Sequence, residues 1–116
     1  MLDIPCGDLT WMSKFMINRT DVLYTGMDIV PDIVRHHTRV YSSKHPHMRF
    51  INQDIAATPL RHQYDVIHTR QMTQHLSSED TVKVLNHFKV NPIVIYCQYG
   101  LLVTCTKLKF VNLTIN

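Results

Sequence analysis

The spacing of two acid–glycine pairs constrains the fold of this chain more than any other feature. Asp3 stands at the start of a turn that contains Gly7, and Gly26-Met27-Asp28 ends the next apolar run. In a parallel α/β sheet, a glycine turn after one strand directs backbone N–H groups and a helix N-terminus at a ligand. An ionised carboxylate at the end of the next strand can accept both hydroxyls of a ribose. The pattern therefore predicts a nucleotide pocket in an α/β fold.

Strand and helix signals alternate along the chain, which is typical of parallel βα units rather than of a β-sandwich. Short apolar runs predict the strands, and apolar residues at helical spacing predict the helices between them. The expected strands are residues 1–4, 22–28, 48–52 and 64–69, and the expected helices are residues 9–18, 31–41 and 77–88.

Each expected helix begins at a residue suited to a helix N-terminus. Asp8 can cap the first helix, and Pro31 suits the first turn of the second. Ser77 with Asp80 has the spacing of a capping box for the third. The apolar or inward-facing positions are Trp11, Met12, Phe15 and Met16 in the first helix, Ile33, Val34, His37, Val40 and Tyr41 in the second, and Val82, Leu85 and Phe88 in the third.

The carboxyl-terminal part is less regular. Two apolar runs, residues 93–97 and 101–106, are separated by Gly100, and we favour residues 101–106 as the fifth strand. Residues 107–116 form an atypical tail with no assigned element. Few apolar residues precede Asp3 in the first strand, and few strands follow the fifth. We therefore expect one incomplete domain over residues 1–116, a fragment truncated at both ends.

Composition argues against several classes of protein. No apolar run is long enough to cross a bilayer, so no membrane partner is expected. Twelve Lys and Arg residues are scattered singly and the net charge is only +3, which gives nucleic-acid binding little support. The eight histidines and three cysteines have no metal-ligand spacing, so no metal site is expected. An odd number of cysteines favours reduced thiols and a cytoplasmic location.

Four segments in order resemble motifs of class I S-adenosylmethionine-dependent methyltransferases. Leu2–Met12 resembles the first motif of a group in which it reads Asp-x-Pro-Cys-Gly-Asp followed by an aromatic-Met pair. Residues 24–31, 50–55 and 65–77 resemble the second, third and fourth motifs. The resemblance implies a Rossmann-like parallel sheet with flanking helices, of which this chain holds about five of seven strands. It also implies S-adenosyl-L-methionine as the cofactor.

The resemblance assigns parts of the cofactor to particular residues. Asp3 and the turn from Pro5 to Asp8 would face its methionine part, and Asp28 would bind the ribose. Asp54 would accept the adenine amino group. The complete set of expected cofactor-binding residues is Asp3, Pro5, Cys6, Gly7, Asp8, Trp11, Asp28, Ile29, Asp54, Ile55, Thr69 and Arg70.

The chemistry of the turn agrees with this assignment in part. Gly7 lets a backbone approach a ligand closely, whereas Pro5 has no N–H group to offer. The amides of Cys6, Gly7 and Asp8 are therefore expected to bind the ligand. The chain departs from the family pattern at Leu9, where the usual turn has a third glycine, and at Gln71, where the group has an aspartate.

Methyl transfer needs the nucleophile, the methyl group and the sulfur held in line, and it needs a base only when the acceptor arrives protonated. His75, which matches a His-Leu pair of the family, is our candidate base, and His68 is the second. The acceptor, a small molecule or a protein, is not identified by the sequence.

Two other functions stay open at this point. The chain is either a catalytically inert fragment that serves as a partner for another chain, or, less favoured, an NAD-dependent dehydrogenase. The dehydrogenase fingerprint places Gly-x-Gly-x-x-Gly directly after the first strand. Only Gly7 is present here, and Pro5 would crowd the path of the pyrophosphate.

Overall fold

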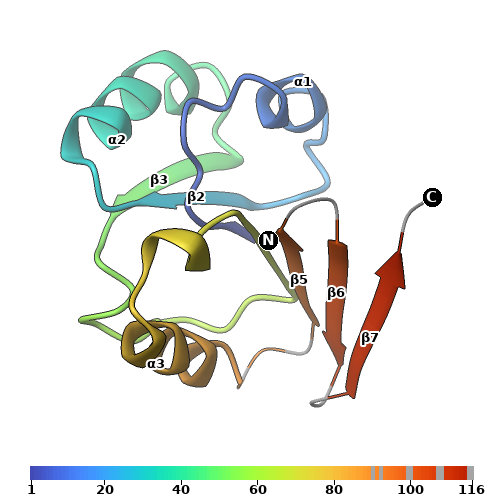
Figure 1. Ribbon diagram of the computed structural model, residues 1–116. Coiled ribbons are helices and arrows are strands. Elements are labelled where there is room, and N and C mark those ends of the chain that lie inside the picture. The colour runs from blue at the N-terminus through green and yellow to red at the C-terminus, as the bar shows by residue number, and fades with distance from the viewer. Residues whose placement is uncertain (90, 92, 99–100, 107–108, 115–116) are drawn as a thin grey trace. The chain divides into compact units, whose positions relative to one another are not determined.

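The computed structural model describes the backbone of residues 1–89, 91, 93–98, 101–106 and 109–114, and the side chains of residues 1–89 and 91. The chain forms two compact units, Met1–Gln53 and Asp54–Asn116. Figure 1 shows the path of the chain through each unit. Within the described residues, no helix is both long and apolar enough to span a membrane.

The first unit contains parallel strands β1 (Leu2–Asp3), β2 (Tyr24–Asp28) and β3 (Met48–Asn52). Strand β2 lies between the other two, with Asp3 opposite Gly26 and Asp28 opposite Asn52. Because the strands run in the same direction, the turn after β1 and the end of β2 meet at one edge of the sheet. The sequence predicted the bounds of β3 correctly.

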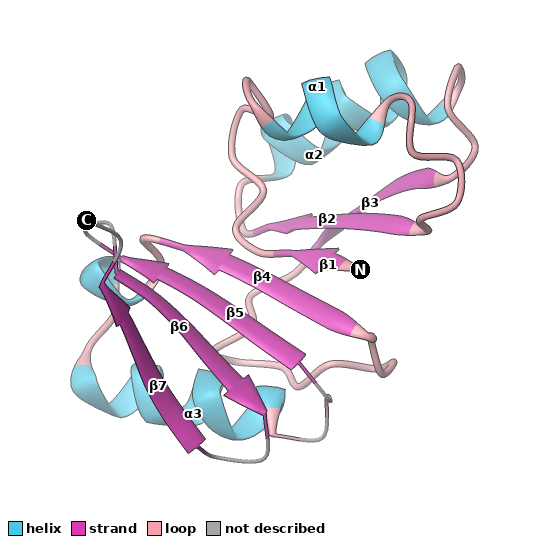
Figure 2. Ribbon diagram, turned by 90° about the vertical axis from the view of Figure 1, so that its right-hand side faces the viewer, coloured by secondary structure: helices cyan, strands magenta, loops and turns pink. Residues whose placement is uncertain are grey.

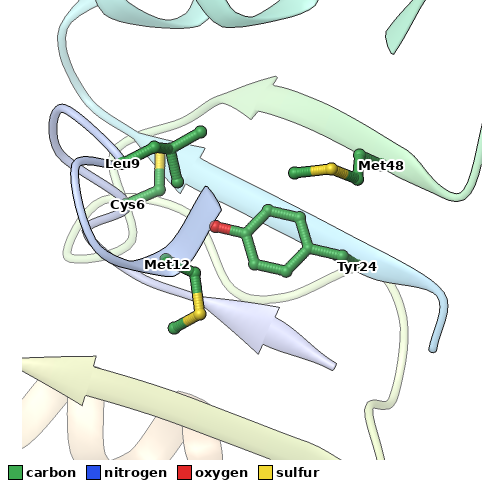
Figure 3. Packing of buried hydrophobic residues seen from close by; sticks show 5 residues of the cluster. All are labelled: Cys6, Leu9, Met12, Tyr24 and Met48. Atoms are coloured by element: carbon green, nitrogen blue, oxygen red, sulfur yellow. The ribbon is translucent and has the colours of Figure 1, made fainter. Parts of the chain in front are cut away.

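Helices α1 (Met12–Met16) and α2 (Pro31–His37) cover one face of this sheet (Figure 2). A π-helical turn, η1 (Thr38–Ser42), continues α2. The core below the helices consists of Cys6, Leu9, Met12, Tyr24 and Met48, which Figure 3 shows grouped around the Tyr24 ring. This core packs the turn after β1 and helix α1 against strands β2 and β3.

Helix α1 is shorter than the sequence predicted. Leu9 has a φ of 61°, outside the helical region, and the helix begins only after Trp11. The prediction that Asp8 caps the helix is wrong, since Asp8 Oδ1 accepts a hydrogen bond from the Thr10 amide in a local turn. Phe15, expected in the core, is 61% exposed. Because the turn at Leu9 delays the start of α1, the helix has only five residues, which are too few for a continuous apolar face.

The second unit contains β4 (Val66–Arg70), a short 3₁₀ helix η2 (Thr73–His75), α3 (Ser78–Phe88), β5 (Ile93–Gln98), β6 (Leu101–Thr106) and β7 (Lys109–Thr114). Strand β5 is parallel to β4, β6 pairs with β5 in antiparallel orientation, and β7 pairs with β6 in antiparallel orientation. Both apolar runs are therefore strands, and the parallel fifth strand is β5 rather than residues 101–106. Residues 109–114, to which the sequence assigned no element, pair with β6.

Helix α3 begins as the sequence predicted. The Ser77 hydroxyl accepts a hydrogen bond from the Asp80 amide at 3.0 Å, which satisfies one of the unpaired N–H groups of the first turn. The buried face differs from the expected one: Val84 and Phe88 are buried, whereas Val82 is 58% exposed. Val84 lies one turn before Phe88, so the two side chains share a face of the helix.

Candidate functional site

The turn after β1 contains two residues in the left-handed region. Gly7 has a φ of 54°, and a Cβ atom added there would meet nothing within 4 Å. Glycine is therefore favoured at this position by the backbone conformation and not by a lack of space. Leu9, at the position of the third glycine of the family pattern, also has a positive φ, and it is only 1% exposed. Its burial compensates for a backbone conformation that glycine would adopt more easily.

The Asp28 carboxylate is the centre of the candidate site in the first unit. Its Oδ2 accepts a hydrogen bond from the Gly7 amide and its Oδ1 accepts one from the Val30 amide, both at 3.0 Å. The side chain is 5% exposed. Because each carboxylate oxygen has two lone pairs, both oxygens keep acceptor capacity for a ligand hydroxyl.

The backbone amides of the turn are used differently from the expectation. The Cys6 amide donates to Met27 O at 2.9 Å, and the Gly7 amide donates to Asp28. The prediction that these two N–H groups bind the ligand is therefore wrong for this structure. They instead attach the turn to β2, and the Gly7 amide orients the Asp28 carboxylate. The Ile4–Pro5 peptide bond in the same turn is cis.

Asp3 is 3% exposed, and its Oδ2 accepts a 2.7 Å hydrogen bond from the Tyr24 hydroxyl. Burial and the neighbouring Asp3 charge both hold the pKa of Tyr24 well above its usual value. The phenol therefore keeps its proton and stays a donor to Asp3 under ordinary conditions. A buried carboxylate of this kind is stabilised by its hydrogen-bond partners.

The Cys6 thiol lies next to these two acids. Burial, and then the charges of Asp28 and Asp3, raise its pKa to about 12. Cys6 is therefore an uncharged thiol at neutral pH and a poor nucleophile, because the thiolate is the reactive form. Cys6 serves as a small buried residue of the core beneath the turn.

Sequence reasoning missed two residues that hold this site. Asn52 Nδ2 donates to Asp28 O at 2.9 Å and to Ile29 O at 3.0 Å, so the end of β3 fixes the backbone that carries Asp28. His37 Nε2 lies 2.6 Å from Gly7 O. A polar residue at the end of a strand was a signal for Asn52. His37 had been assigned only an inward-facing position.

Two expected apolar residues of the first unit lie on its surface. Ile29, which directly follows Asp28, is 60% exposed, and Trp11 is 39% exposed. The Trp11 and Phe15 rings form an edge-to-face pair with their centroids 6.1 Å apart. Asp8 is exposed as well. These side chains are therefore accessible in the first unit.

The remaining candidates lie in the second unit. Asp54 is exposed, and its Oδ1 accepts a hydrogen bond from the Ala56 amide at 2.9 Å, which is a local turn. Ile55 is buried, and its carbonyl accepts a 2.7 Å hydrogen bond from His87 Nδ1. The structure thus holds the backbone of this loop on α3 and leaves the Asp54 side chain accessible.

The end of β4 carries Thr69 and Arg70. Thr69 is fully buried, and its Oγ1 has no hydrogen-bond partner among the described residues. Arg70 is exposed, and Gln71 has a φ of 54°. His75 is exposed on η2, with its Nε2 3.2 Å from Gln74 Nε2. In this contact the amide nitrogen is the donor and His75 Nε2 is the acceptor.

Each unit therefore collects part of the expected set. The first unit brings together Asp3, Cys6, Gly7 and Asp28 at one edge of its sheet, and the second carries Asp54, Thr69, Arg70 and His75. Among the residues that the structure describes, no three His, Cys, Asp or Glu side chains form a group that could hold a metal ion.

Comparison with known proteins identifies a family. Residues 1–90 match the family described as "Methyltransferase domain". This match covers all the candidate residues discussed above. Among curated proteins, none matches the sequence significantly.

Solved structures share the fold. A TehB-like SAM-dependent methyltransferase from Corynebacterium glutamicum is 14% identical with a TM-score of 0.64, covering 82% of this chain and 52% of its own. PKMT2 from Rickettsia typhi, solved in complex with AdoHcy, is 20% identical with a TM-score of 0.70, covering 82% of this chain and 20% of its own. An S-adenosylmethionine-dependent methyltransferase from Clostridium acetobutylicum is 16% identical with a TM-score of 0.66, covering 82% and 40%.

These likenesses confirm the expected Rossmann-like α/β fold. The chain spans about half the length of the first of these structures and less of the other two.

Proposed function

The chain belongs to the methyltransferase-domain family, and on that premise we propose that it binds S-adenosyl-L-methionine and transfers the methyl group to an acceptor. The observation that carries the proposal is the Asp28 carboxylate at the end of β2, oriented by the Gly7 and Val30 amides. A carboxylate held in this way accepts hydrogen bonds and donates none, which suits the two hydroxyls of a ribose.

The other residues divide the work of binding. We assign the methionine part of the cofactor to Asp3 and the turn from Pro5 to Asp8, and we assign packing on the adenine to Ile29, with Trp11 lining the site. Asp54 is assigned to the adenine amino group, with Ile55 beside it in the sequence. Ile29 and Trp11 offer exposed apolar surface, and Asp54 offers an exposed carboxylate, which supports these roles.

Thr69 and Arg70 are assigned to the region of the reacting sulfur. Thr69 Oγ1 has no hydrogen-bond partner among the residues whose side chains the structure describes, and a bound group that paired with it would satisfy a buried hydroxyl, which supports this role.

When bound, S-adenosylmethionine supplies a methyl group on a positively charged sulfur. The protein then has to hold the acceptor in line with that methyl group and exclude competing orientations. We propose His75 as the base for an acceptor that arrives protonated, since its ring is exposed on η2, shortly after β4. The acceptor is an unidentified small molecule or protein. An odd number of cysteines without metal-ligand spacing favours reduced thiols, and we propose the cytoplasm.

Isothermal titration with S-adenosylhomocysteine and, separately, with NAD tests the proposal. We expect binding of S-adenosylhomocysteine and none of NAD. The Asp28→Asn variant should bind S-adenosylhomocysteine about 10-fold to 100-fold more weakly, because a hydrogen bond to a charged acceptor contributes about 1.5–3 kcal/mol. Asp32→Asn, which changes an exposed acid on α2, is the matched control and should bind as tightly as the wild type.

Two outcomes would contradict the proposal. A preference for NAD would move the chain to the dehydrogenase class. Equal affinity of Asp28→Asn and the wild type for S-adenosylhomocysteine would remove Asp28 from the site. Circular dichroism on every variant separates lost binding from lost structure, and a folded wild-type chain that binds neither ligand would favour a role as a partner for another protein.

A further inference from the structure

His37 occupies a fixed position at the end of α2. The residue is 4% exposed, and its ring centroid lies 5.3 Å from that of Phe50 on β3 and 5.8 Å from that of Tyr41 on η1. Contacts with these two neighbouring rings limit rotation of the imidazole. Its direction is therefore set by the packing of α2 on the sheet.

The hydrogen bond of His37 determines which ring nitrogen carries the proton. Nε2 lies 2.6 Å from Gly7 O, and a carbonyl oxygen can only accept. Nε2 is therefore the protonated nitrogen. Nδ1 is buried and has no hydrogen-bond partner among the described residues, so a proton there would also lack an acceptor. A tautomer with its proton on Nε2 is the one that fits these contacts.

Gly7 is consequently held from both sides. Its carbonyl accepts from His37, thirty residues away along the chain, and its amide donates to Asp28 Oδ2. Glycine has the greatest backbone freedom of any residue, and this one sits at a φ of 54°. The two hydrogen bonds select one of its accessible conformations.

We propose that His37 is a positioning residue of the cofactor pocket: through Gly7 it holds the turn after β1 in the conformation that orients the Asp28 carboxylate. The proposal rests on the proposed function, since it assigns His37 to the same pocket. His37 is almost fully buried, and its effect passes through the Gly7 peptide group. Loss of its N–H group should let the turn populate conformations in which Asp28 is not oriented for a ribose.

A residue that only fills the core would behave differently. Such a residue needs an aromatic ring of suitable size but no N–H group at the ε position. The ring contacts with Phe50 and Tyr41 would be kept by phenylalanine, whereas the hydrogen bond to Gly7 would be lost. Substitutions that separate the ring from the N–H group therefore distinguish the two roles.

The experiment measures S-adenosylhomocysteine affinity by isothermal titration for the wild type, His37→Phe, His37→Gln and His36→Gln. His37→Phe keeps a ring and loses the donor, and we expect binding about fivefold to tenfold weaker, the equivalent of one neutral hydrogen bond. His37→Gln loses the ring but keeps an amide N–H near the position of Nε2, and it should recover most of the affinity. His36 is exposed and its ring packs edge-to-face on that of His37, so His36→Gln alters the surroundings of His37 but keeps its hydrogen bond to Gly7; as the control, it should show no change.

A second readout does not depend on the ligand. The ¹⁵N chemical shifts of the His37 ring should show the Nε2–H tautomer at neutral pH in the wild-type chain. The Nδ1–H tautomer would overturn the proposal, and so would a His37→Phe variant that binds as tightly as the wild type. A wild type that binds no S-adenosylhomocysteine overturns the proposed function and this inference with it, whereas normal wild-type binding with an unaffected His37→Phe variant overturns this inference alone.

Discussion

The Tyr24 hydroxyl donates a 2.7 Å hydrogen bond to Asp3 Oδ2, and both side chains are buried. The bond joins the first residue of β2 to the last residue of β1. It therefore supports the carboxylate at the point where the chain enters the glycine turn.

Removing this hydroxyl should destabilise the fold. Tyr24→Phe keeps the ring but leaves the buried Asp3 carboxylate without this donor, and we expect the free energy of unfolding to fall by about 1–3 kcal/mol. Urea unfolding followed by circular dichroism measures the change. Tyr41→Phe, which changes a half-buried tyrosine that also contacts Phe50, is the control. An equal loss in both variants would show that Asp3 does not depend on Tyr24.

A methyl group at position 26 should not fit. A Cβ atom on Gly26 would lie 2.7 Å from Cδ1 and 2.8 Å from Cε1 of Phe50, closer than such atoms approach. Gly26→Ala should therefore cost about 1–3 kcal/mol of stability through overpacking. Combining it with Phe50→Leu should recover part of that loss, so a double-mutant cycle should give a favourable coupling energy. Additive effects would argue that the ring moves aside without cost.

The Cys6 thiol should make stability depend on alkaline pH. Its pKa is about 12 in the folded chain against 9.0 for an ordinary thiol, so the folded state holds a proton that the unfolded state releases. The contribution of the Cys6 thiol to the free energy of unfolding is complete below pH 9. It is lost as the pH rises toward 12, by at most about 1.4 kcal/mol per pH unit.

Urea unfolding between pH 8 and pH 10 checks this dependence in a chain whose Cys97 and Cys105 are replaced by alanine. The additional change Cys6→Ala should flatten the decline of stability with pH. The same slope with and without Cys6 would contradict the raised pKa.

The cap of α3 should make a measurable contribution. Ser77→Ala removes the acceptor of the Asp80 amide and should lower stability by about 0.5–2 kcal/mol. Ser78→Ala, at the next exposed position, removes a hydroxyl that does not cap the helix and should change stability by less than about 0.5 kcal/mol. Thermal unfolding of the three chains compares them directly, and similar losses for both variants would exclude the cap as the cause.

Local signals predicted the elements whose causes are local. The bounds of β3, the end of β2 at Asp28 and the Ser77 cap follow from residues within a few positions of each other. A strand pattern or a capping hydroxyl acts on its own neighbourhood, so the sequence displays it. The acids at strand ends were visible for the same reason.

Other elements depended on partners far along the chain. Residues 93–98 and 101–106 have similar apolar patterns, and only pairing shows that the first runs parallel to β4 and the second antiparallel to it. The predicted start of helix α1 was wrong because Leu9 has a positive φ, which its burial in the core maintains. Neither feature has a signature in the neighbouring residues.

The sequence by itself determined the class of fold and the positions of Asp3, Gly7 and Asp28, because strand periodicity and glycine turns are properties of short segments. Only the tertiary structure decided what holds those residues in place. Tyr24 reaches Asp3 across 21 positions and His37 reaches Gly7 across 30, and such hydrogen bonds exist only once helices have packed on the sheet. Their energies depend on burial, which no local pattern encodes.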